Sequence, residues 1–112
     1  AGGYHHHIGL NTWHSKGGPK PAPGTTGLYH VAFLYPTRAA LAKALANVLS
    51  HGIELTGHAD HGVSQAIYFG DPDGNGIELY WDRARDDWPW QADGTLSMVN
   101  ERLEIEELLT PA

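Results

Sequence analysis

The sequence predicts an α+β fold, in which a strand–helix–strand–strand–strand (βαβββ) unit follows one extra strand near the N-terminus. Three observations lead to this prediction: one clear helical pattern, several short segments in which apolar residues alternate, and glycine- and proline-rich turns between them. The chain has 112 residues, enough for a single hydrophobic core. Its composition, 41% hydrophobic and 18% charged, is ordinary for a globular protein.

The extra strand is expected at residues 4–10, inside the sequence GGYHHHIGLNTW, which contains three consecutive histidines. Alternate residues of a strand face opposite sides of a sheet, so His5 and His7 share one face and His6 lies on the other. The three imidazoles therefore cannot all bind one metal ion. Residues 14–27 are rich in glycine and proline, which predicts a connector without helix or central strand.

The βαβββ unit begins with a predicted strand at 28–35, which Pro36 ends. The segment TRAALAKALANVLSHG that follows is the clearest helix of the chain, with Thr37 as its expected N-cap and Gly52 as its stop signal. Four apolar residues define the predicted buried side of this helix: Leu41, Leu45, Val48 and Leu49.

The other strands of the unit are short. One is expected within IELTGHADHG and one at 64–69, and the turn sequence DPDGNG leads into a last strand at 77–81. The polar, tryptophan-rich tail is expected to end in a short acidic helix around 100–109. The predicted organisation of this single domain is an N-terminal strand (1–13), a connector (14–27), the βαβββ unit (28–85) and a tail (86–112).

Strand alternation also predicts which side chains share a face. The helix must cover the face that carries most of the apolar residues, which are Tyr29, Val31, Phe33, Ile77, Leu79 and Trp81. The opposite face carries His30 and Glu78, and a half-buried glutamate on a strand is unusual unless it is paired or binds a metal. An imidazole and a carboxylate from separate strands suit the two-histidine-one-carboxylate sites of non-haem iron proteins. A core histidine and a solvated glutamate would give the same pattern.

Composition excludes several classes of protein. The net charge of −6 and the lack of a basic stripe argue against nucleic acid as a partner. With no cysteine, the chain has no disulfide, thiolate nucleophile or cysteine-ligated zinc site. No apolar run approaches the roughly 20 residues that span a membrane, and no secretory signal is visible, so we expect no membrane partner and a cytoplasmic location.

Three stretches, GGYHHHIGLNTW, GLYHVAF and DHGVSQAIYFGDPDGNGIELYWDR, together resemble the vicinal oxygen chelate superfamily of glyoxalase I, bleomycin resistance proteins and type I extradiol dioxygenases. Within it the sequence is most similar to the catechol 2,3-dioxygenases, over residues 3 to about 90. The stretch DPDGNGIELY is typical of the superfamily and not of one reaction. The resemblance implies that 28–85 is one vicinal oxygen chelate module, and that 1–13 is the last strand of a preceding, mostly missing module.

The resemblance also implies roles for individual residues. His30 and Glu78 match a metal-binding histidine and the metal-binding carboxylate of the family. His61 and Tyr68 match the histidine and tyrosine that flank the substrate and dioxygen. His7 is the match to the catalytic acid–base histidine, which the family carries on the last strand of the preceding module.

The function implied is that of the C-terminal part of an Fe(II)-dependent extradiol ring-cleaving dioxygenase, or one that uses Mn(II), acting on a catechol and dioxygen. The family's other metal-binding histidine belongs to the missing module, so we expect a homodimer or a missing N-terminal half to complete the site. One alternative is a glyoxalase-like isomerase or lyase, in which two copies of His30 and Glu78 share a metal. The other is a metal-free, bleomycin-resistance-type module that binds an aromatic ligand. His61 and Tyr68 favour the dioxygenase, because simple sequestration does not need them.

Overall fold

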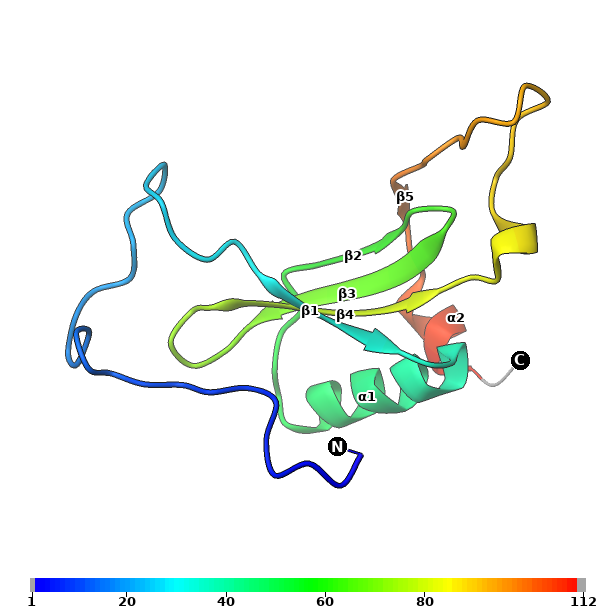
Figure 1. Cartoon of the computed structure of the whole chain (residues 1–112). Coiled ribbons are helices and arrows are strands. Elements are labelled where there is room, and N and C mark those ends of the chain that lie inside the picture. Colours follow the sequence, from blue (N-terminus) through cyan, green and yellow to red (C-terminus); the bar gives the residue numbers. More distant parts are fainter. Residues whose placement is uncertain (1, 111–112) are drawn as a thin grey trace.

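The protein folds into a mixed five-stranded sheet with a long helix packed on one face, which confirms the predicted α+β class (Figure 1). The structure is a computed structural model and describes residues 2–110, so the outermost residues of the predicted N-terminal segment and tail lie outside it. The strands lie in the order β1-β4-β3-β2-β5. The elements are β1 (Val31–Tyr35), α1 (Arg38–Ser50), β2 (Gly57–Asp60), β3 (Ser64–Gly70), β4 (Gly76–Asp82), the 3₁₀ turn η1 (Arg85–Asp87), β5 (Glu101–Arg102) and α2 (Ile105–Leu109).

Strand β4 lies between the first and third strands, and its two neighbours run in different directions. It is parallel to β1, with Ala32 opposite Glu78, and antiparallel to β3, with Tyr68 opposite Glu78. The parallel pair needs the crossover that α1 supplies, whereas the tight turn after β3 suffices for the antiparallel pair. The predicted βαβββ order is therefore confirmed.

Helix α1 begins and ends where its sequence indicated. The side-chain oxygen of Thr37 accepts a hydrogen bond of 3.0 Å from the backbone N–H of Ala40, which makes Thr37 the N-cap. Gly52 follows the C-cap with a φ of +71°, a conformation in which glycine is favoured. Leu49 was expected on the buried side but is exposed, because it lies about 80° around the helix from Leu41.

The core lies between α1, the sheet and the C-terminal tail. Phe33, Ile77 and Trp81 pack against it, as strand alternation predicted. Tyr29 does not: it is 88% exposed, because β1 begins only at Val31 and residues 28–30 extend beyond the helix-covered part of the sheet. The buried cluster consists of Leu41, Leu45, Val48, Ile67, Leu79, Leu103 and Leu108.

The strand expected at residues 4–10 is not formed. The segment is exposed and irregular, and Figure 1 shows it (dark blue) running apart from the sheet. A strand needs a neighbour whose N–H and C=O groups pair with its own, and no strand of the part described here lies beside these residues. Residues 14–27 are also exposed and contain turns without helix or strand, as expected of a connector.

The tail contributes more to the fold than its polar sequence indicated. The short acidic helix is confirmed as α2, while β5, which pairs with β2, was not predicted. Leu103 and Leu108 place the tail in the core. Among residues 2–110, no helix has the length and apolar character needed to cross a membrane.

Candidate functional site

Four of the five residues selected from the sequence lie together on the sheet face opposite α1. Nε2 of His30 lies 2.9 Å from Oε2 of Glu78. The Tyr68 hydroxyl donates a hydrogen bond of 3.2 Å to the other oxygen, Oε1, of Glu78. Nε2 of His61 lies 3.3 Å from the Tyr68 hydroxyl oxygen. Since the single phenolic proton goes to Glu78, Nε2 of His61 is the donor to Tyr68 in this arrangement.

The register of the strands explains this grouping. Tyr68 on β3 and Glu78 on β4 are directly opposite each other, so their side chains stand side by side on one face. His30 is two residues before Ala32, the partner of Glu78 on β1, and so has the same orientation. His61 lies in the turn between β2 and β3. The residue between its ring and Tyr68 on this face is the small, fully buried Ala66, which leaves room for the two rings to meet.

Partial burial sets the electrostatics of the group. The side chain of Glu78 is 14% exposed and that of His30 is 28% exposed, so neither is freely solvated. Burial, together with the negative charge of Glu78 and its hydrogen bond, raises the pKa of Tyr68 to about 12. The phenol is therefore protonated at neutral pH and remains a hydrogen-bond donor.

A pocket of about 330 Å³ opens beside His30 and Tyr68. Its volume is at the lower end of the range for small-molecule sites and suits a ligand of about one aromatic ring. Both polar and apolar groups line it, a combination that can fix the orientation of a small ligand. The lining residues are Tyr29, His30, Thr56, Gly57, Tyr68, Phe69, Gly76 and Ile77.

His7, the fifth residue selected, does not line this pocket. It lies in the exposed N-terminal segment, where its ring is 5.2 Å from that of Tyr4. His7 lies away from the pocket because residues 4–10 do not form the strand that was expected to place its side chain beside the sheet.

The donor atoms of His30 and Glu78 suit two positions of one metal ion. Two ligand atoms bound at about 2.1 Å and at right angles lie about 3 Å apart, close to the observed 2.9 Å between Nε2 and Oε2. Within residues 2–110, no group of three histidine, aspartate or glutamate side chains could hold a metal ion. In the described part of the chain, His30 and Glu78 therefore have the spacing of two ligand atoms, and no third side chain of this kind lies with them.

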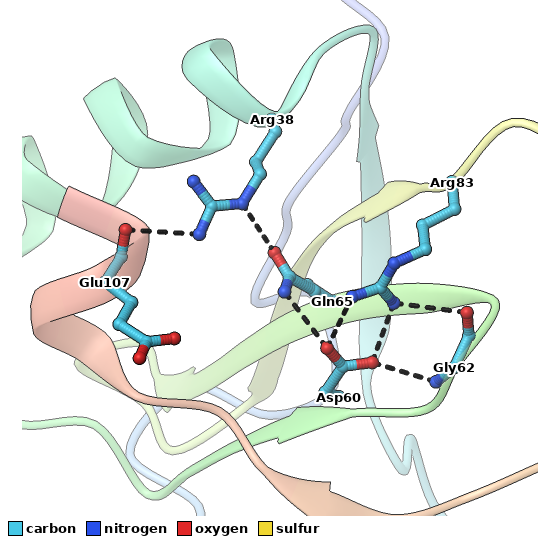
Figure 2. A network of polar contacts seen from close by, with 6 residues as sticks. All are labelled: Arg38, Asp60, Gly62, Gln65, Arg83 and Glu107. Atoms are coloured by element: carbon cyan, nitrogen blue, oxygen red, sulfur yellow. Dashed lines mark hydrogen bonds and ion pairs between the residues drawn. The ribbon is translucent and has the colours of Figure 1, made fainter. Parts of the chain in front are cut away.

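Sequence reasoning missed a polar network beneath the turn that carries His61. Asp60, at the end of β2, pairs with Arg83, which follows β4, and also accepts a hydrogen bond from Gln65 on β3 (Figure 2). The hydrogen bonds from Arg83 hold the pKa of Asp60 well below its usual range. The residue that could have indicated this network from the sequence is Gln65, which is polar although it lies on the same side of β3 as the apolar Ile67 and Phe69.

The fold is that of a known class of protein. The chain belongs to the Glyoxalase/Bleomycin resistance protein/Dioxygenase superfamily, whose model matches residues 1–79. It is 49% identical over 92 residues to the catechol-2,3-dioxygenase of Bacillus subtilis (strain 168), an alignment that covers 82% of this chain and 32% of that protein. It is 38% identical over 78 residues to biphenyl-2,3-diol 1,2-dioxygenase 3 of Rhodococcus globerulus, covering 70% of this chain and 41% of the relative.

Among solved structures, a glyoxalase/dioxygenase from Nostoc punctiforme matches with a TM-score of 0.49 and 28% identity, over 59% of this chain and 46% of that one. The family model and the curated relatives confirm the family expected from the sequence. The chain spans about a third of the first curated relative and about two fifths of the second.

Proposed function

We propose that this chain supplies the metal-binding carboxylate, one metal-binding histidine and the neighbouring hydrogen-bond donors of an extradiol dioxygenase that cleaves a catechol-type diol. The observation that carries the proposal is the connected set His30, Glu78, Tyr68 and His61 beside a ring-sized pocket. The identity of 49% to a catechol-2,3-dioxygenase supports the same reaction.

His30 and Glu78 would hold the divalent metal ion, Fe(II) or Mn(II), through Nε2 and Oε2. When bound, such an ion supplies positive charge that favours the ionised catechol and a redox-active centre for the reaction with dioxygen. The Tyr68 hydroxyl occupies Oε1 of Glu78, which fixes the plane of the carboxylate and leaves Oε2 directed toward His30. Partners of this kind orient a metal ligand and are part of the site.

Tyr68 and His61 would act on the substrate side. The raised pKa of Tyr68 keeps its proton on the phenol oxygen at neutral pH, at the wall of the pocket. His61 donates to that oxygen and so orients the phenol. In the structure the phenol proton goes to Glu78, so on substrate binding Tyr68 would turn its O–H from Glu78 toward an oxygen atom that gains negative charge in the pocket, while His61 holds the phenol from the other side.

A second polypeptide segment would complete the site. Within residues 2–110 of one chain no third ligand lies beside His30 and Glu78, and β1 is at the edge of the sheet with its outer side unpaired. An open edge favours pairing with another strand. We propose that a second copy of this chain, or a preceding half, adds strands here, and that residues 4–10 become a strand and bring His7 to the pocket on that assembly. The cytoplasmic location stays a prediction.

The test is metal content and ring cleavage measured on one anaerobic preparation of the chain. We expect bound iron or manganese and a yellow ring-fission product from catechol. Glu78→Gln should lose both, whereas Glu54→Gln, which removes an exposed carboxylate, should lose neither. Metal without cleavage but with isomerisation of a glutathione hemithioacetal would favour the glyoxalase-like alternative. Aromatic binding with no metal dependence would favour the resistance-type module.

A further inference from the structure

The turn that carries His61 is short and tightly held. Asp60 ends β2 and Ser64 begins β3, and the N–H of His61 donates to the carbonyl of Ser64 over 2.9 Å. Gly62 has a φ of +80°, at the first central position of a two-residue hairpin turn, where glycine is preferred. A Cβ added there would lie 2.9 Å from Cγ of Pro89, so the tail packs directly on the turn.

One carboxylate binds both sides of this turn. Oδ1 of Asp60 accepts hydrogen bonds from Nη1 of Arg83 at 2.7 Å and from the backbone N–H of Gly62 at 2.9 Å. Its Oδ2 accepts from Nη2 of Arg83 at 2.6 Å and from Nε2 of Gln65 at 3.0 Å. Nη1 of Arg83 also donates to the carbonyl of Gly62 over 3.1 Å. Figure 2 shows that the residues before and after His61 are thus tied to a single guanidinium. We refer to Asp60, Gln65 and Arg83 as the clamp.

The clamp and the ring of His61 lie on opposite faces of the sheet. Asp60 is opposite Gln65, and Gln65 is opposite Trp81, which packs against the core beneath α1. His61, one residue after Asp60, projects to the other face, where it meets Tyr68.

The clamp is also anchored to both helices. Nε of Arg38, at the start of α1, donates to Oε1 of Gln65 over 3.0 Å, and its Nη2 donates to the carbonyl of Glu107 in α2 over 3.1 Å (Figure 2). The turn is therefore connected to α1 and α2 and not only to its own hairpin.

We propose that Asp60 and Arg83 are positioning residues for His61: they hold the turn so that Nε2 of His61 stays within hydrogen-bond distance of the Tyr68 hydroxyl. This inference rests on the proposed function, in which His61 and Tyr68 act at the pocket. The forked pair fixes direction as well as distance, because a bidentate arginine–carboxylate contact allows one relative orientation of its two groups. Only about a fifth to a quarter of each side chain is exposed, which limits competition from water.

Two conservative substitutions test the clamp by breaking it. Arg83→Lys keeps the positive charge but cannot contact both oxygens of Asp60 and the carbonyl of Gly62. Asp60→Asn keeps the shape of the side chain and removes its charge. Arg102→Lys is the matched control, since it changes the arginine of an exposed pair with Glu104.

The first readout is the imidazole nitrogen resonance of His61 in the folded, purified chain, measured by NMR. With the clamp broken, we expect this resonance to shift toward its position in Tyr68→Phe, where its partner is absent. Arg102→Lys should leave it unchanged. A role in stability alone would lower the melting temperature and leave this resonance in place. An unshifted resonance in folded Arg83→Lys and Asp60→Asn would therefore overturn the proposal.

The second readout is a double-mutant cycle on catechol cleavage. We expect Arg83→Lys to lower kcat about ten- to a hundredfold with KM little changed, because misplacing a group by about 1 Å has effects of this size. In a His61→Gln background the same substitution should cause no further loss. An equal loss in both backgrounds would contradict the proposal.

Asp60→Asn provides both readouts if Arg83→Lys does not fold. A lack of catechol cleavage that persists when the chain is combined with the preceding half would refute the proposed function, and the His61 resonance would still decide whether the clamp positions that ring.

Discussion

Asp60→Asn should destabilise the protein at neutral pH and do so much less in acid. The substitution removes the charge that accepts two hydrogen bonds from Arg83, and it leaves that guanidinium half-buried without its counter-ion. Hydrogen bonds to charged groups contribute about 1.5–3 kcal/mol, and breaking a fully buried pair costs about 3–5 kcal/mol. Because this pair is partly exposed, we expect a loss of about 2 kcal/mol. For a domain of this size, the melting temperature should fall by about 8 °C.

The sign of the pH dependence follows from the lowered pKa of Asp60. Its pKa in the folded protein lies below the ordinary value of 3.8, so the pair contributes its full stability above that value and loses it as the pH falls toward the folded pKa. At pH 3 the unfolded chain has already gained the proton, and about 1 kcal/mol of the contribution is gone.

Thermal unfolding followed by circular dichroism at pH 7, 5 and 3 measures both effects. The difference between wild type and Asp60→Asn should be equal at pH 7 and 5 and about halved at pH 3. Glu104→Gln, which removes the carboxylate of an exposed ion pair, is the control and should change the melting temperature little. A difference below about 2 °C at pH 7, or one that persists unchanged at pH 3, would refute this account of the pair.

Three further predictions concern the site, the turn and the assembly. Tyr68→Phe should lower kcat for catechol more than it raises KM, because in the proposed function the hydrogen bond from the Tyr68 hydroxyl acts after dioxygen has reacted. Steady-state kinetics measure this, and an unchanged kcat would show that Tyr68 has no part in the mechanism. Gly62→Ala should lower the free energy of unfolding by at least about 1 kcal/mol, because the φ of Gly62 is +80° and the new Cβ would contact Pro89. Chemical denaturation measures this free energy, and an equally stable variant would contradict the geometry of the turn. In sedimentation at micromolar concentration the chain should be larger than its monomer mass of 12.2 kDa, and a well-folded, monodisperse monomer would show that the open β1 edge needs no partner.

Local patterns were enough to predict much of the fold and the grouping of side chains. Alternation along a strand decides the face, so His30 and Glu78 could be assigned to one side without knowledge of their distance, and the family resemblance added Tyr68 to them. The N-cap at Thr37 depends only on residues within one helical turn.

Features that depend on distant partners could not be predicted in the same way. A strand at 4–10 requires a pairing partner, and alternation in its own sequence cannot supply one. The contact between Asp60 and Arg83 joins residues 23 positions apart, and it forms only because β2, β3 and β4 lie side by side. Nothing in either local sequence distinguishes these residues from ordinary surface charges.

The burial of Leu103 and Leu108 has a consequence for exchanging modules between members of this family. The match to the family model ends at residue 79, yet the hydrophobic core extends through α2, because both leucines pack in the cluster that α1 and β3 share. A chimaera that transferred only the matched residues would leave Leu41 and Leu45 without part of their cover and expose apolar surface to water. Each buried leucine side chain contributes about 1.5–3 kcal/mol by its removal from water. A transplantable segment must therefore reach at least residue 108, well beyond the last strand that defines the module.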